Sequence, residues 1–345
     1  MIIEIRATGK AIPSTRLSND DLAKTLDTND EWITSHTGIK ARHIADEATA
    51  CSDLALEAAR QALALVITQE GTPEQTIEDA ALTVDLIILG TATPDYHGCP
   101  STACIVQDKL GARNAFAMDI SAGCTGFIYG IETAAALLAY TPSRKRALVI
   151  GSEILSRFTD WHDRKSCVLF GDGAGAVLLE KTFEPQDGSP TKRGILQTIL
   201  GADGSGAEHI IIRRGGSRSA FKTGDFIDVP PVLEMNGQAV YNFAVKSITE
   251  TIEKLLAAEN ITIDAVQWIV PHQANRRILT AAGKRLGIPE ERFFLNLDEY
   301  ANTSAASIPI ALDELNRGGK LQKGDIIMII GFGGGLTSGG SLIVW

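Results

Sequence analysis

The chain has 345 residues, of which 44% are hydrophobic and 21% are charged, with a formal net charge of -10. This length and composition can bury a large core, and length alone favours two domains. The negative charge would repel nucleic acid phosphates, so nucleic acid is excluded as a partner, and an acidic protein partner would need a local basic patch.

No targeting or membrane segment is expected in this sequence. The start, MIIEIRATGKAIPS, lacks a basic stretch followed by an apolar run, so we predict no signal peptide. The apolar runs 86–89 and 326–330 are strand-sized and too short to span a bilayer. We therefore predict a cytoplasmic protein that does not bind membranes.

The cysteines do not form a framework for disulfides or metal. Their odd number and scattered positions argue against disulfides, and no CxxC motif or histidine cluster accompanies them. We predict no metal site. The five are Cys51, Cys99, Cys104, Cys124 and Cys167.

Short apolar strands alternate with helical segments, which predicts an α/β fold with buried strands. In chain order we expect a helix over 52–66, strands over 84–90 and 116–120, a helix over 127–138, a strand over 147–151, a helix over 238–257, a strand over 266–270, a helix over 276–286 and a strand over 326–331. The polar stretch 68–79 is predicted to be a surface insertion. The Pro/Gly-rich stretch 183–193 divides the chain into halves, 1–185 and 186–345.

The two halves resemble each other. Three pairs of strings align in the same order, at offsets of 182, 180 and 178: VDLIILG with VQWIVPH, LVIG with MIIG, and FAMDISAGCTGF with FLNLDEYANTSA. The last pair aligns Cys124 with Asn302 (302 − 124 = 178). This pattern indicates gene duplication. We expect two similar halves about a pseudo-twofold axis, with equivalent strand ends meeting in one central site.

Cys124 is the candidate nucleophile. It lies in SAGCTG between the strand 116–120 and the helix 127–138, where small residues permit a sharp turn. The N–H groups at a helix N-terminus favour the thiolate and are expected to lower its pKa. A lone cysteine is more often a core thiol, but this context favours the nucleophile. The other four cysteines are interpreted as core thiols.

His272 and Asn302 are the candidate partners of the nucleophile. His272 follows the strand 266–270, and is either a satisfied structural residue or a donor to a developing oxyanion. Asn302 lies in a small polar turn before a helix, as an N-cap or as a second donor to that oxyanion. Papain-like proteases also combine Cys, His and Asn, but their local signatures are absent.

Two glycine-rich stretches are weak candidates for phosphate binding, because they lack the Walker lysine and a dinucleotide fingerprint. For 171–175 we favour tight backbone packing between the halves. The turn 333–335 is also a candidate to direct a backbone N–H into the site.

With these motifs assembled, the chain resembles the β-ketoacyl-acyl-carrier-protein synthase III family, the initiating condensing enzymes of type II fatty acid synthesis. The similarity runs nearly end to end and is carried by NDEWITSHTGIKARHI, SAGCTGF, VLFGDGAGAVLLE, VPHQANRRI, NTSAASIP and GFGGGLTSGG. It implies the thiolase-like α/β fold, with two similar five-layered αβαβα halves related by a pseudo-twofold axis, and usually a homodimer.

The resemblance also implies a mechanism. Cys124 takes the acyl group from an acyl-CoA, and malonyl-acyl carrier protein then loses carbon dioxide. His272 and Asn302 stabilise the resulting enolate, which attacks the acyl-cysteine. The backbone N–H groups of Cys124 and Gly334 form the oxyanion hole, and Phe332 favours loss of the carboxylate by desolvation. No cofactor is implied, because the CoA thioester is a substrate. Elongating synthases have a second histidine at the position of Asn302.

Substrate contacts follow from the same resemblance. Trp32 and Arg164 would enclose the adenine of CoA, and Asn275 would bond the pantetheine arm. Cys99 stands where acetyl-specific members have phenylalanine at the end of the acyl pocket, which favours a longer or branched primer. The residues implied to dock the acidic carrier protein are Arg276, Arg277, Lys284 and Arg285.

Besides Cys99, three positions depart from the family pattern: His36 replaces arginine, Ala301 replaces glycine and Ser338 replaces tryptophan. His36 puts one CoA or carrier contact in doubt, and the sequence gives no functional interpretation of the other two.

Other functions stay open at this point. One is a relative of secondary metabolism with a different acceptor. Hydroxymethylglutaryl-CoA synthase is a further relative, but it needs a catalytic glutamate that we cannot place. Another is a non-catalytic acyl-CoA-binding protein, which would have no need of a thiol, an imidazole and an amide together.

Overall fold

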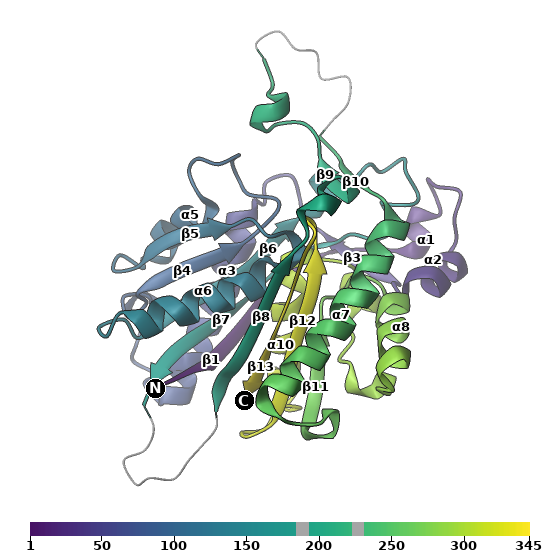
Figure 1. The fold of residues 1–345 in the computed structure, drawn as a ribbon. Helices are drawn as coiled ribbons and strands as arrows, with labels where there is room; N and C mark the ends of the chain where they lie inside the picture. The colour runs from purple at the N-terminus through teal and green to yellow at the C-terminus, as the bar shows by residue number, and fades with distance from the viewer. Residues whose placement is uncertain (184–192, 223–230) are drawn as a thin grey trace.

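The computed structural model describes residues 1–183, 193–222 and 231–345, and two main sheets organise them (Figure 1). In the first sheet β4 pairs in parallel with β5 and β6, whereas β6 with β7 and β7 with β1 are antiparallel. Its order is β1 (Ile2–Ala11), β7 (Asp172–Thr182), β6 (Arg146–Ile154), β4 (Leu86–Gly90) and β5 (Phe116–Ile120).

The second sheet repeats this pattern. Its order is β8 (Gly194–Ala202), β13 (Thr337–Val344), β12 (Ile326–Gly333) and β11 (Val266–Pro271). The pair β11–β12 is parallel, and β12–β13 and β13–β8 are antiparallel, as in the first sheet. A parallel bridge between Ile269 and Phe293 stands where β4 pairs with β5. The two halves therefore share one topology, and the predicted boundary between them lies among residues 184–192, outside the described residues.

The sheets and helices stack as five layers shared between the halves (Figure 1). Helices α3 (Cys51–Glu70) and α5 (Thr102–Leu110) cover the outer face of the first sheet. Helices α6 (Gly126–Tyr140) and α10 (Ser307–Arg317) lie between the sheets. Helices α7 (Gly237–Glu259) and α8 (Arg276–Leu286) cover the outer face of the second sheet.

The sequence explains why these elements occupy these layers. Along β4, Leu86 and Ile88 join the central core, whereas Ile87 and Leu89 join the outer one. A strand buried on both faces needs such a continuous apolar run. Helix α6 is buried between two sheets and is apolar around most of its surface, as such a position requires.

The remaining elements lie at the edges of these layers. They are α1 (Asn19–Leu22), α2 (Asp30–Thr37), α4 (Ile77–Ala81), α9 (Leu297–Tyr300), the pair β2 (Thr15–Ser18) and β3 (Ala41–Ile44), and the pair β9 (Ile210–Ile212) and β10 (Leu233–Met235). The predicted insertion 68–79 overlaps the end of α3 and the start of α4. Across the described ranges, every helix is too short or too polar to cross a membrane.

Candidate active site

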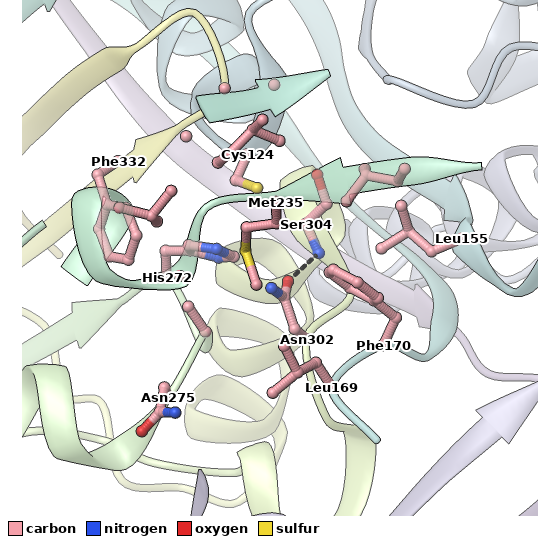
Figure 2. Close-up of a pocket in the computed structure, with 18 of the residues that line it drawn as sticks. Cys124, Leu155, Leu169, Phe170, Met235, His272, Asn275, Asn302, Ser304 and Phe332 are labelled. Carbon is pink, nitrogen blue, oxygen red and sulfur yellow. Dashed lines mark hydrogen bonds between the residues drawn. The ribbon is translucent and has the colours of Figure 1, made fainter. Parts of the chain in front are cut away.

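A cavity of about 660 Å³ collects the predicted site residues from both halves. Cys124, His272 and Asn302 all line it, together with Phe332 and Gly334. Figure 2 shows the side chains of Cys124, His272 and Asn302 directed toward the same part of the cavity. Residues that are 148 and 178 positions from Cys124 in the sequence thus share one space.

Cys124 lies in a tight turn, residues 123–125, that leads directly into α6. Gly123 has a φ of +52°, and a Cβ there would lie 2.8 Å from the backbone nitrogen of Gly334. At Gly333 a Cβ would lie 2.5 Å from the nitrogen of Cys124. These glycines let the two backbones meet beside Cys124, and the N–H groups of Cys124 and Gly334 act to lower the pKa of its thiol.

The expectation that the Cys124 pKa is lowered was wrong. Burial raises the pKa of the thiol to about 12, and this outweighs the hydrogen bonds from Ser304 and from the two backbone N–H groups. The carboxylate of Glu153 raises it further. An apolar cavity disfavours the charged form of any acid. The free chain therefore holds Cys124 as a neutral thiol at neutral pH.

His272 is 1% exposed, and burial lowers its pKa to about 3, so the imidazole is neutral at neutral pH. Its Nδ1 lies 2.7 Å from Ser307 Oγ, which accepts a hydrogen bond from the backbone N–H of Gln273. The Ser307 hydroxyl has a single proton. Donated to Nδ1, it leaves the proton of the neutral ring on Nε2; donated to the Ser304 carbonyl, which lies 2.8 Å from Oγ, it leaves the ring proton on Nδ1. The Phe332 ring lies edge-on to His272, at 5.3 Å between centroids, and keeps this side of the cavity apolar.

Asn302 is held by its backbone and by its side chain. Its N–H donates to the carbonyl of Leu169, and its carbonyl accepts from the N–H of Gly171. Its Oδ1 accepts from the N–H of Ser304 at 2.8 Å, which leaves Nδ2 as the donor (Figure 2). The N-cap of α10 is Ala306. The structure therefore places Asn302 ahead of the helix rather than at its cap.

The helices correct the predicted alignment of the halves. Helix α6 begins at Gly126 and α10 at Ser307, an offset of 181 (307 − 126). At the same offset, Gly123 and Ser304 both have a left-handed backbone. The equivalent of Cys124 is therefore Ala305, not Asn302. Relative to the predicted offset of 178, the second half therefore has three more residues before its central helix, in the segment that holds α9.

The residues predicted to enclose adenine lie at the rim of the cavity. Trp32 lines it and stacks on His36 at 4.6 Å between ring centroids. The Arg164 guanidinium lies 5.1 Å from the Trp32 ring centre and donates to the carbonyl of Asp27. Trp32 and Arg164 thus contact each other directly, so a third ring would enter only if they separate.

Asn275 is the N-cap of α8, where its Oδ1 accepts from the N–H of Arg277 at 2.8 Å. Its Nδ2 donates to the carbonyl of His36 at 3.2 Å, which leaves one amide hydrogen for a ligand. Asn275 lines the cavity. Its local role as a cap is therefore compatible with one further contact.

The prediction that Cys99 ends the acyl pocket is not met within one chain. Cys99 is exposed and does not line the cavity. After β4 ends at Gly90, the chain turns outward before α5, and residues 96–100 are all exposed. This loop therefore holds the cysteine away from the cavity of its own chain.

The four predicted docking residues are all exposed on α8. Arg276, Arg277 and Lys284 line a second cavity of about 310 Å³. It adjoins the first, because Arg277 and Tyr241 line both. Arg276 is paired with Glu290 at 2.6 Å. A basic surface therefore borders the entrance to the cavity, and Arg285 extends it at the last turn of α8.

Several residues of the site were missed from the sequence. Ser304 and Ser307 lie in the quoted string NTSAASIP, and their spacing of three could have placed both beside Asn302. The fully buried Glu153 at the end of β6 gave no signal, because it lies in an ordinary strand. An apolar wall from β9 and β10 also lines the cavity: Ile210, Ile211, Ile212, Leu233 and Met235.

Two family models and full-length relatives match this chain. Residues 118–204 match the model of 3-oxoacyl-[acyl-carrier-protein (ACP)] synthase III, and residues 256–345 match that of its C-terminal part. The β-ketoacyl-[acyl-carrier-protein] synthase III of Natranaerobius thermophilus is 46% identical over 99% of both chains. That of Clostridium perfringens is 47% identical over 97% of both. The crystal structure of 3-oxoacyl-[acyl-carrier-protein] synthase III from Aquifex aeolicus has a TM-score of 0.85 at 40% identity, and the match covers 99% of this chain and 100% of that one.

Proposed function

The chain belongs to the β-ketoacyl-[acyl-carrier-protein] synthase III family of thiolase-like initiating condensing enzymes, and on that premise we propose that Cys124, His272 and Asn302 carry its reaction. Cys124 takes an acyl group from an acyl-CoA as a thioester. His272 and Asn302 then act on malonyl-acyl carrier protein. Formation of a covalent thioester divides the condensation into two steps, which predicts ping-pong kinetics.

One observation carries the proposal: Cys124, His272, Asn302 and the backbone of Gly334 line one cavity with a largely apolar wall. The N–H groups of Cys124 and Gly334 lie at the turn that carries the thiol, and would donate to the carbonyl oxygen of the thioester as it develops charge in a tetrahedral intermediate. Preorganised donors of this kind stabilise such charge strongly, because no solvent must reorganise. Acylation breaks the thioester of the acyl-CoA, forms the Cys124 thioester, and transfers the thiol proton to the departing CoA sulfur.

The second step uses the side chains of His272 and Asn302. When malonyl thioester loses carbon dioxide, the electron pair of the broken bond forms an enolate. The neutral imidazole of His272 and the Nδ2 of Asn302 can donate to its oxygen. The apolar ring of Phe332 beside His272 disfavours the charged carboxylate and favours its loss. The enolate carbon then attacks the acyl-cysteine and frees the thiolate.

The partners follow from the same reaction. Acyl-CoA would bind at the rim near Trp32 and Arg164, once these side chains separate, with Asn275 on the pantetheine arm. The acidic carrier protein would dock on the basic surface of α8. We also propose a homodimer in the cytoplasm, in which Cys99 of the exposed loop 96–100 reaches the acyl pocket of the second copy.

The test is intact-protein mass spectrometry after incubation with acyl-CoAs from acetyl to long-chain. We expect a single acyl adduct on the wild type and none on Cys124→Ala, and the chain that loads fastest identifies the primer. Cys51→Ala is the matched control, because Cys51 is buried away from the cavity and should leave loading unchanged. If no acyl-CoA forms an adduct on the wild type, the proposed priming step is wrong.

A further inference from the structure

The loop that carries Asn302 has an unusual backbone. In residues 1–183, 193–222 and 231–345, three non-glycine residues have a positive φ, and two of them enclose Asn302: Ala301 at 57° and Ser304 at 49°. A side chain is disfavoured there because its Cβ approaches a carbonyl oxygen. Such positions persist when the surrounding structure holds them, and they gather at functional sites.

The backbone of Ser304 connects two of the proposed catalytic groups. Its N–H donates to Asn302 Oδ1 at 2.8 Å, which turns the amide nitrogen of Asn302 toward the cavity (Figure 2). Its carbonyl oxygen lies 2.8 Å from Ser307 Oγ, which lies 2.7 Å from His272 Nδ1. The Ser304 peptide therefore orients the amide directly and reaches the imidazole through Ser307, whose single proton serves either the carbonyl or Nδ1.

The side chain of Ser304 connects the third group. Cys124 and Ser304 line the same cavity, and the Ser304 side chain acts to lower the pKa of the Cys124 thiol and of the Glu153 carboxyl, against the larger effect of burial. Glu153 is fully buried, and accepts from Thr93 Oγ1 at 2.7 Å and from the N–H of Ala92 at 3.1 Å. These bonds hold the Glu153 carboxyl in place.

We propose that Ser304 is a positioning residue. Its N–H, its carbonyl and its hydroxyl would hold Asn302, His272 and Cys124 in the orientation relative to one another that the reaction needs. This inference rests on the proposed function of those three groups. Gly123, the equivalent residue of the first half, accepts the same left-handed backbone without strain. Glycine would lack the hydroxyl, and its freedom would loosen the peptide that orients the amide and the imidazole.

The experiment compares Ser304→Ala and Ser304→Gly with Ser341→Ala, whose serine is equally buried on β13 and hydrogen bonds to Thr198 outside the cavity. Three quantities are measured: the rate at which iodoacetamide alkylates the peptide containing Cys124, kcat and KM for condensation, and the midpoint of thermal unfolding. A hydrogen bond to a charged group supports a change of roughly tenfold. We expect Ser304→Ala to lower the alkylation rate and kcat by about this factor at unchanged KM.

Ser304→Gly separates positioning from simple stability. Its kcat should fall by the same factor as that of Ser304→Ala. Its unfolding midpoint should equal or exceed that of the wild type, because glycine removes the backbone strain. If Ser304→Ala does not fold, Ser304→Gly decides the question alone. The proposal is wrong if the alkylation rate and kcat of Ser304→Ala and Ser304→Gly all lie within twofold of the values for Ser341→Ala. Alkylation needs no acyl-CoA, so it tests Ser304 even if the wild type loads no acyl group and the proposed function fails.

Discussion

The turn that begins α6 and the turn that begins α10 are equivalent in a duplicated fold, yet they satisfy the same backbone requirement with different residues. Gly123 serves the first turn, where a second backbone passes so closely that any Cβ would collide with it. Ser304 serves the second, where its N–H donates to Asn302 and its carbonyl accepts from Ser307. Glycine thus allows two backbones to approach each other closely, whereas a serine with a strained backbone holds neighbouring side chains in place.

The same difference separates the chemistry of the halves. The first half provides the nucleophile and one oxyanion donor, and the second provides the imidazole and the amide. If this division is correct, changes in one half should affect one step more than the other. The following changes test that expectation, beginning with the largest effect.

His272→Ala should separate the two steps most clearly. Loss of one preorganised donor in an apolar site costs about 10²–10³ in rate, so carbon dioxide release from malonyl-acyl carrier protein should fall by that factor. Acyl loading, followed by intact mass, should stay within a few-fold of the wild type. His162→Ala, which changes a histidine whose side chain is 99% exposed, is the control. Equal loss of both steps would contradict the division between the halves.

Gly123→Ala should break the first turn. Its Cβ would lie 2.8 Å from the nitrogen of Gly334, in a backbone region that costs about 1–3 kcal/mol for a side chain. We expect that loss of unfolding free energy in denaturant titration, with acyl loading slowed at least about tenfold. Gly111→Ala is a matched control, because Gly111 has a φ of +76° but nothing within 4 Å of its Cβ position. Equal effects of the two changes would show that the close approach has no role.

Arg277→Glu sharpens the comparison at the equivalent helices α5 and α8. The α5 sequence, TACIVQDKL, balances its charges, whereas α8 exposes four basic residues beside the entrance. Reversing one charge should raise KM for the carrier protein about tenfold while kcat stays constant, and added salt should reduce the difference. Arg113→Glu, an exposed change beside α5, should leave KM unchanged. A fall in kcat at constant KM would argue against docking at α8.

Ala301→Gly should have the smallest effect, and it should be favourable. Ala301 has φ 57° and ψ −154°, a region occupied almost only by glycine. Glycine should raise the free energy of unfolding by up to about 1 kcal/mol, after the added entropy of the unfolded chain is subtracted. Ala306→Gly, at an ordinary φ of −78°, should instead destabilise. Denaturant titration of both variants measures the difference. A lower free energy of unfolding for both would show that the backbone of Ala301 is not strained.

The sequence predicts the regular elements well and the turns poorly. The bounds of β5 and α8 agree with the structure, because apolar period and flanking glycine or asparagine determine them locally. The alignment of Cys124 with Asn302 was wrong because α9 inserts three residues that no apolar pattern marks. The pKa of Cys124 depends on burial by segments that are distant in the chain. The position of Cys99 depends on the direction of the loop that carries it. Ser304 has a left-handed backbone only because two halves pack around it, which its neighbours in sequence do not reveal.

The central layer of helices determines whether either half of the chain can fold alone. Helices α6 and α10 come from different halves, and their apolar residues merge with the inner faces of both sheets into one core. A gene fragment for residues 1–185 or for 186–345 would encode a product with one whole sheet face uncovered, which favours aggregation. We expect each fragment alone to be insoluble, and the two produced together to recover activity by complementation. The ancestor of such a duplication would have met the same requirement as an obligate dimer of two identical short chains.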